Sequence, residues 1–106
     1  MKYTNLPLYD SQDYFYTVTL ENVSCKLRIY YNQRVDGWFY ELSEEGGAML
    51  VAGERLVSLY PMILDYTSLP FTGFLWLEPI GTSGTKFTTD SYNLHKWFRL
   101  FYITEQ

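Results

Sequence analysis

The sequence predicts an all-β fold, a small single-domain antiparallel barrel or sandwich of about six or seven strands with one irregular loop. Several segments alternate apolar and polar side chains with a period of two, which is typical of strands with one buried face. Turn residues separate these segments. Aromatic residues, which pack well on sheets, make up 20% of the chain. With 106 residues there is room for one hydrophobic core, so we expect residues 1–106 to form one domain.

The first half of the chain predicts an antiparallel meander. Two alternating segments flank a tight turn at Glu21-Asn22 and predict a β-hairpin. A third strand follows the turn at Asp36-Gly37, and a fourth extended segment runs from Met49 to Val57, with Gly53 indicating a bulge. The expected inward-facing residues of the first three strands are Tyr14, Tyr16, Val18, Leu20, Cys25, Leu27, Ile29, Tyr31, Trp38, Tyr40 and Leu42.

The second half is less regular. Residues 59–72 contain two prolines and no strict alternation, so we expect a loop anchored by Tyr60, Leu64 and Tyr66. A strand is predicted over residues 73–78. The last strand is predicted from His95 to Ile103 and is apolar on both faces, which indicates a strand inside a barrel or sandwich, or one with a face covered by another chain.

The N-terminal arm, residues 1–12, carries Leu6, Leu8 and Tyr9 ahead of the first hairpin. An apolar arm with a proline either forms an edge strand of its own domain or docks on a neighbouring protein. The sequence leaves both alternatives open.

Composition excludes several classes of function. The net charge of −4, with scattered Lys and Arg, argues against nucleic-acid recognition. No segment is long and apolar enough to predict a membrane helix, and no secretory signal precedes the domain, so we expect synthesis in the cytoplasm. Cys25 is the only cysteine, so no disulfide within the chain is possible.

The sequence offers no catalytic, metal or cofactor site. His95 is the only histidine, and Cys25 shares its parity with core residues, which predicts a buried, unreactive thiol. The acidic pairs Glu44/Glu45 and Asp10/Asp13 lie in turns or linkers, where solvated carboxylates are far commoner than acid/base pairs. We therefore expect a protein that is not an enzyme.

The surplus of aromatic residues, with 11 Tyr, 7 Phe and 3 Trp, predicts a protein-binding surface, because tyrosine and tryptophan are enriched at interfaces. A small carbohydrate- or ligand-binding β-module is the alternative, since the same rings stack on sugars. Aromatic and apolar residues in segments without strand periodicity are the best candidates for contact. The predicted interface residues are Leu6, Leu8, Tyr9, Tyr60, Tyr66, Tyr92 and Trp97.

The order of several motifs resembles the cyanophage-type baseplate plug proteins of contractile-tailed bacteriophages. The resemblance covers about 100 residues and departs from the family pattern between Glu78 and Leu94. The motifs are Leu6-Pro7-Leu8, Tyr16-Thr17-Val18-Thr19-Leu20, Arg28-Ile29-Tyr30-Tyr31-Asn32-Gln33-Arg34, Gly37-Trp38-Phe39, Gly46-Gly47, Val51-Ala52-Gly53-Glu54-Arg55-Leu56-Val57 and Arg99-Leu100-Phe101-Tyr102.

This resemblance implies a virion structural protein in the tail baseplate, close to the central hub and tube. It implies contacts with other baseplate, hub or tube proteins and with copies of itself, during tail assembly and genome delivery. It also implies the absence of a cofactor and of catalytic residues, while charge and hydropathy lead us to expect no nucleic-acid recognition and no membrane partner.

Overall fold

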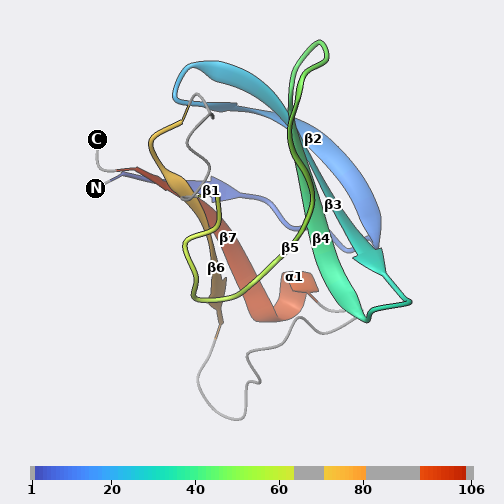
Figure 1. The fold of residues 1–106 in the computed structure, drawn as a ribbon. Helices are drawn as coiled ribbons and strands as arrows, with labels where there is room; N and C mark the ends of the chain where they lie inside the picture. The colour runs from blue at the N-terminus through green and yellow to red at the C-terminus, as the bar shows by residue number, and fades with distance from the viewer. Residues whose placement is uncertain (1, 64–70, 81–93, 105–106) are drawn as a thin grey trace.

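Two antiparallel sheets pack face to face as an open sandwich (Figure 1). The computed structural model describes residues 2–63, 71–80 and 94–104. Within this part of the chain, one sheet has the strand order β1-β7-β6 and the other the order β2-β3-β4-β5. The sheets do not close into a barrel, so the structure confirms the sandwich of the two predicted architectures. The elements are β1 Lys2–Leu6, β2 Asp13–Leu20, β3 Val23–Asn32, β4 Gly37–Glu44, β5 Met49–Arg55, β6 Phe74–Pro79, α1 Leu94–Trp97 and β7 Phe98–Thr104.

The four-stranded sheet is the predicted meander. β2 pairs with β3 in unbroken register from Asp13 opposite Tyr30 to Leu20 opposite Val23. The two residues between the strands, Glu21 and Asn22, have φ of 48° and 68°, as the tight hairpin turn that matches the sheet twist requires. Along each of these strands the residues predicted to face inward are buried or half-buried.

β5 is irregular, as Gly53 predicts. Its pairing with β4 shifts twice, first between Tyr40 and Leu42 and again between Leu42 and Ser43. Gly53 lies at the first shift with φ of 61°, a conformation that costs glycine little because it has no Cβ. The strand ends at Arg55, two residues before the predicted end.

The N-terminal arm supplies an edge strand of its own domain. β1 pairs with β7 from Lys2 opposite Thr104 to Leu6 opposite Leu100, so the two terminal strands lie side by side (Figure 1). This is the first of the two alternatives that the sequence leaves open for the arm.

The predicted strand from His95 is wrong in its first residues. Leu94–Trp97 forms one helical turn, α1, and β7 begins only at Phe98. The apolar pattern is ambiguous here, because Leu94 and Phe98 are four residues apart and share a helical face as readily as a strand face. Both are buried. From Phe98 onward the strand is as predicted, and Phe98, Leu100 and Tyr102 form its inward face.

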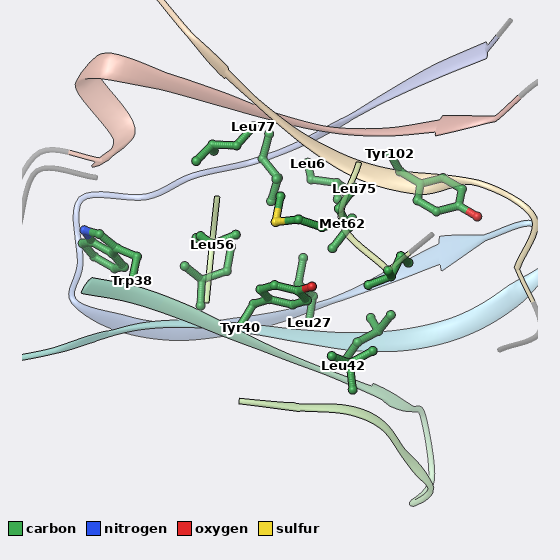
Figure 2. Packing of buried hydrophobic residues seen from close by; sticks show 14 of the residues in the cluster. Leu6, Leu27, Trp38, Tyr40, Leu42, Leu56, Met62, Leu75, Leu77 and Tyr102 are labelled. Atoms are coloured by element: carbon green, nitrogen blue, oxygen red, sulfur yellow. The ribbon is translucent and has the colours of Figure 1, made fainter. Parts of the chain in front are cut away.

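The core lies between the sheets (Figure 2). Leu6, Leu75 and Tyr102 from one sheet face Leu27 and Leu42 from the other, and all five are at most 2% exposed. At about 25 cal/mol per Å² of buried apolar surface, such contacts are the main stabilising contribution to the fold.

Residues 56–63, which we call the strap, run beside β6 and cover its free edge. Met62 pairs with Leu75 through two backbone hydrogen bonds of 3.0 Å. The anchor is therefore Met62 together with Ile63, both buried, whereas Tyr60, expected to anchor this loop, is 50% exposed. The other two expected anchors, Leu64 and Tyr66, lie outside the described residues.

Candidate protein–protein interface

Eight large apolar side chains are exposed among the described residues, and they are not spread evenly. Three of them fall within four consecutive positions of the strap. Exposed apolar side chains that gather in one place are typical of interaction surfaces, whereas isolated ones need no explanation. The eight are Tyr3, Tyr9, Phe15, Val35, Met49, Val57, Leu59 and Tyr60.

Two residues of the strap have an unusual backbone conformation, in the segment that exposes Val57, Leu59 and Tyr60. Leu59 and Ile63 have φ of 57° and 65°, a left-handed conformation that is costly for side chains other than glycine. Such conformations cost on the order of 1–3 kcal/mol and persist where the surroundings impose them, often at binding sites. Here, backbone hydrogen bonds of Leu59 with Leu77 and of Met62 with Leu75 hold the strap against β6.

A shallow cavity of about 200 Å³ lies between the strap and the end of β5. Its floor is the buried side chains of Tyr40, Met62 and Ile63, and its rim includes Tyr60 and Arg55. A cavity of this size accepts one large side chain of a partner better than a whole small ligand, because ligand sites usually enclose about 300–1,000 Å³. The strap and this cavity together form a candidate docking site.

A second candidate is the tyrosine cluster of Tyr9, Tyr14 and Tyr16. The ring of Tyr9 makes edge contacts with Tyr14 at 5.3 Å and Tyr16 at 6.0 Å between centroids. The backbone N–H of Tyr9 donates to the Tyr14 hydroxyl at 3.1 Å. These contacts bury part of Tyr9, and 52% of its surface remains exposed and could contact a partner.

The outer faces of the two sheets differ in chemistry. On the four-stranded sheet, cations cover the rings, with the Lys26 ammonium 4.0 Å above Phe15 and the Arg28 guanidinium 4.2 Å above Tyr30. Arg28 also forms a 2.8 Å ion pair with Asp13. These contacts give that face a solvent-compatible, charged surface.

The outer face of the three-stranded sheet is more apolar. Tyr3 meets Phe101 edge to face at 6.2 Å, and Phe74 meets Trp76 in the same way. Ile103 lies between these pairs in the register and is only 6% exposed. The last strand is apolar on both faces because one face packs in the core and the other forms part of this aromatic surface.

The structure distributes the predicted interface residues over several environments. Leu6 is 1% exposed and belongs to the core, because β1 turns its side chain inward; we therefore do not retain it as an interface residue. Leu8 is half-buried against the core, and Tyr9 and Tyr60 are half-exposed. Tyr66, Tyr92 and the side chain of Trp97 lie outside the described residues.

Sequence reasoning missed Val57 and Leu59, which are exposed beside Tyr60. The proline-bounded segment marked the place, but an apolar residue in a loop does not reveal whether it points inward. It also missed Glu21, whose carboxylate joins the two sheets. That carboxylate accepts hydrogen bonds from the Thr72 backbone and hydroxyl, both at 2.9 Å, and from the Tyr102 hydroxyl.

No catalytic arrangement forms from the candidate residues. Cys25 is fully buried, and burial, with a smaller contribution from Glu44, raises the pKa of its thiol, which disfavours the nucleophilic thiolate. His95 lies 4.0 Å from Asp10, an exposed carboxylate. Among the described residues no group of three or more His, Cys, Asp or Glu side chains could hold a metal ion. The only described helix is too short to cross a membrane.

The fold alone does not establish a function, but exposed apolar side chains gathered on a small β-sandwich are typical of protein-binding proteins. The family model described as "Cyanophage baseplate Pam3 plug gp18" matches residues 1–105, nearly the whole chain. The chain therefore belongs to this family of phage baseplate plug proteins, which are structural components of the tail baseplate in the virion. No curated protein matches the chain in sequence.

Proposed function

We propose that the protein acts near the central hub and tube of the tail baseplate, through protein–protein contacts in tail assembly and genome delivery. Its partners are hub or tube proteins and copies of itself. The observation that carries this proposal is the match to the plug family over residues 1–105. The exposed apolar strap supports it, because such a surface is stabilised by burial against a partner.

Tyr60 is the side chain to test first. It is half-exposed, lies on the rim of the 200 Å³ cavity and belongs to a residue type enriched among interface hot spots. Val57 and Leu59 extend the same surface, and Tyr9 contributes from the tyrosine cluster. Tyr66, Tyr92 and Trp97 complete the proposed interface.

The test is incorporation of Tyr60→Ala into tails assembled with this protein as the only source of plug. Truncation of a central aromatic residue costs about 2 kcal/mol or more of binding free energy, so we expect incorporation to fall at least about tenfold. Tyr3→Ala is the matched control, because Tyr3 is an exposed tyrosine on β1, at the edge of the three-stranded sheet opposite the strap.

Both variants should melt within a few degrees of the wild-type chain, since each removes an exposed ring. Normal incorporation of Tyr60→Ala, or equal loss in both variants, would contradict a contact through the strap. Absence of the wild-type chain from purified baseplates would contradict the proposed function itself.

A further inference from the structure

The edges of the two sheets are not equally protected against pairing with another chain. The strap covers the outer edge of β6, and two register shifts and Gly53 disrupt β5. β1 has five residues. β2 has eight residues without proline, glycine or a register shift, and its single charge, Asp13, is paired with Arg28. A long, regular edge of this kind is the usual template for strand addition.

The hydrogen-bond pattern shows which groups of β2 face outward. The Tyr31 N–H donates to the Gln12 carbonyl at 2.8 Å, so Gln12 is directed toward β3. In an antiparallel pair this direction alternates, so the backbone groups of Phe15, Thr17 and Thr19 face away from β3. Among the described strands, none pairs with this outer edge of β2.

The inner face beside this edge is only half covered. On the central strand β3, the inward residues Cys25, Leu27 and Ile29 are fully buried. On β2, the corresponding residues Tyr14 and Tyr16 are only partly buried, as is Val18. One more strand beside β2 would cover them with the apolar side chains of its own inner face.

Charge on the outer face defines the partner further. Lys26 lies beside Thr17 in the register, and its ammonium group is over the Phe15 ring. No carboxylate in the described part of the chain pairs with this ammonium group. An acidic side chain on the outer face of an added strand, opposite Phe15 or Thr17, would complete the pair.

We propose that the outer edge of β2 receives an extended segment of a neighbouring baseplate protein as a fifth strand, with apolar residues inward and an acidic residue toward Lys26. The proposal rests on the proposed function, which places other proteins around the chain. A second copy fits this edge less well. In antiparallel pairing of two β2 strands about Thr17, no carboxylate of β2 lies opposite Phe15 or Thr17. In pairing about Phe15 the residue opposite Thr17 is Asp13, whose carboxylate is already paired with Arg28 at 2.8 Å.

Hydrogen exchange of the backbone amides tests the proposal without any substitution. In the isolated chain the amides of Phe15, Thr17 and Thr19 should exchange rapidly, while the amides bonded to β3 are protected. In assembled baseplates the exchange of these three amides should slow by at least about tenfold. Unchanged exchange in baseplates that contain the protein would overturn strand addition and leave the proposed function standing.

Thr17→Pro gives an independent test. Proline removes one outward N–H and is tolerated at edge positions whose N–H is not used within the sheet. We expect Thr17→Pro to lower incorporation into baseplates at least about tenfold, because a ladder bond is lost. Thr17→Ala, which keeps the N–H, is the matched control and should be incorporated within about twofold of wild type.

Two further results would overturn the proposal. If the edge amides of the isolated chain become protected as its concentration rises, with no other protein present, the occupant is a second copy. If Thr17→Pro and Thr17→Ala are incorporated equally well while both fold, the outward N–H is not used. Absence of the wild-type chain from the baseplate is a different result and would refute the proposed function instead.

Discussion

Two tyrosine hydroxyls in the sandwich have opposite environments. The Tyr102 hydroxyl donates to Glu21 and accepts from the Gly73 N–H at 3.1 Å. The Tyr16 hydroxyl is buried and has no hydrogen-bond partner among the described residues. Burial raises the pKa of both phenols well above the usual range, so both stay neutral at physiological pH. The two residues therefore contribute to stability in different ways, although both lie on the inward faces of their strands.

Removing the two hydroxyls should have opposite effects. Tyr16→Phe deletes a buried polar atom without a partner, so stability should be unchanged or rise by up to about 1 kcal/mol. Tyr102→Phe leaves Glu21 and Gly73 with one partner fewer and should cost about 1–3 kcal/mol. Chemical denaturation of the isolated chain measures both, and equal losses would contradict this distinction.

Glu21 makes stability depend on pH. Partial burial opposes its ionisation, but the hydrogen bonds from Tyr102, Thr72 and Gly73 outweigh that effect and lower its pKa below the usual 4.5. A lowered folded-state pKa stabilises the fold above the unfolded-state value, and this contribution is lost as the pH falls through the folded-state value.

We therefore expect Glu21→Gln to lower the melting temperature at pH 7, with the difference from wild type shrinking as the pH falls well below 4.5. Melting curves over a pH series measure it. Glu45→Gln is the control, because Glu45 is exposed in the β4–β5 turn and should show no such difference. A gap between Glu21→Gln and wild type that is constant over the whole series would refute the linkage.

At the scale of the elements, the sequence pattern predicted the strands and turns that pair with their neighbours along the chain. The meander from Asp13 to Arg55 follows from alternation and from turns such as Glu21-Asn22, because neighbouring strands along the chain pair with each other. The pairing of β1 with β7 joins segments about 100 residues apart, and no periodicity encodes it. The helical turn at Leu94 and the role of Glu21 were missed for the same reason, since tertiary contacts decide both.

The candidate site was predictable only in outline. Composition indicated an aromatic interface, and the prolines marked the segment that contains Tyr60. Whether Leu6 or Leu59 is exposed depends on how each segment pairs within the three-stranded sheet. The lack of strand periodicity in the arm placed Leu6 at the interface, and the preference for tyrosines in the proline-bounded loop overlooked Leu59.

The start of β6 has a steric requirement that sequence could not show. A Cβ on Gly73 would lie 2.3 Å from the carbonyl oxygen of Ile103 in β7, so Gly73→Ala must push the strands apart and should cost about 3 kcal/mol. Gly46 is the comparison, since a Cβ there meets nothing within 4 Å and only its φ of 108° is unfavourable. Gly46→Ala should cost about 1 kcal/mol. Similar losses on denaturation would contradict the close approach at Gly73.

At the scale of the whole molecule, the first and last strands pair with each other in the three-stranded sheet. β7 lies between β1 and β6, so the three-stranded sheet requires both ends of the chain. Leu6 connects this sheet to the common core, whereas Leu59 lies on the surface of the strap. Leu6 thus contributes to the core and Leu59 to the proposed interface, so substitutions at the two positions can separate stability from assembly.

Leu6→Ala should destabilise the isolated chain by about 2–5 kcal/mol, because it opens a cavity between the sheets. Leu59→Ala should change that stability by less than about 1 kcal/mol, since the side chain is 43% exposed. In baseplate incorporation at a temperature where both variants are folded, the order should reverse, with Leu59→Ala the more defective. Denaturation curves and incorporation measured on the same two proteins decide the matter. If Leu6→Ala is as stable as wild type but fails to assemble, its side chain contacts a partner and β1 is not the edge strand of its own core.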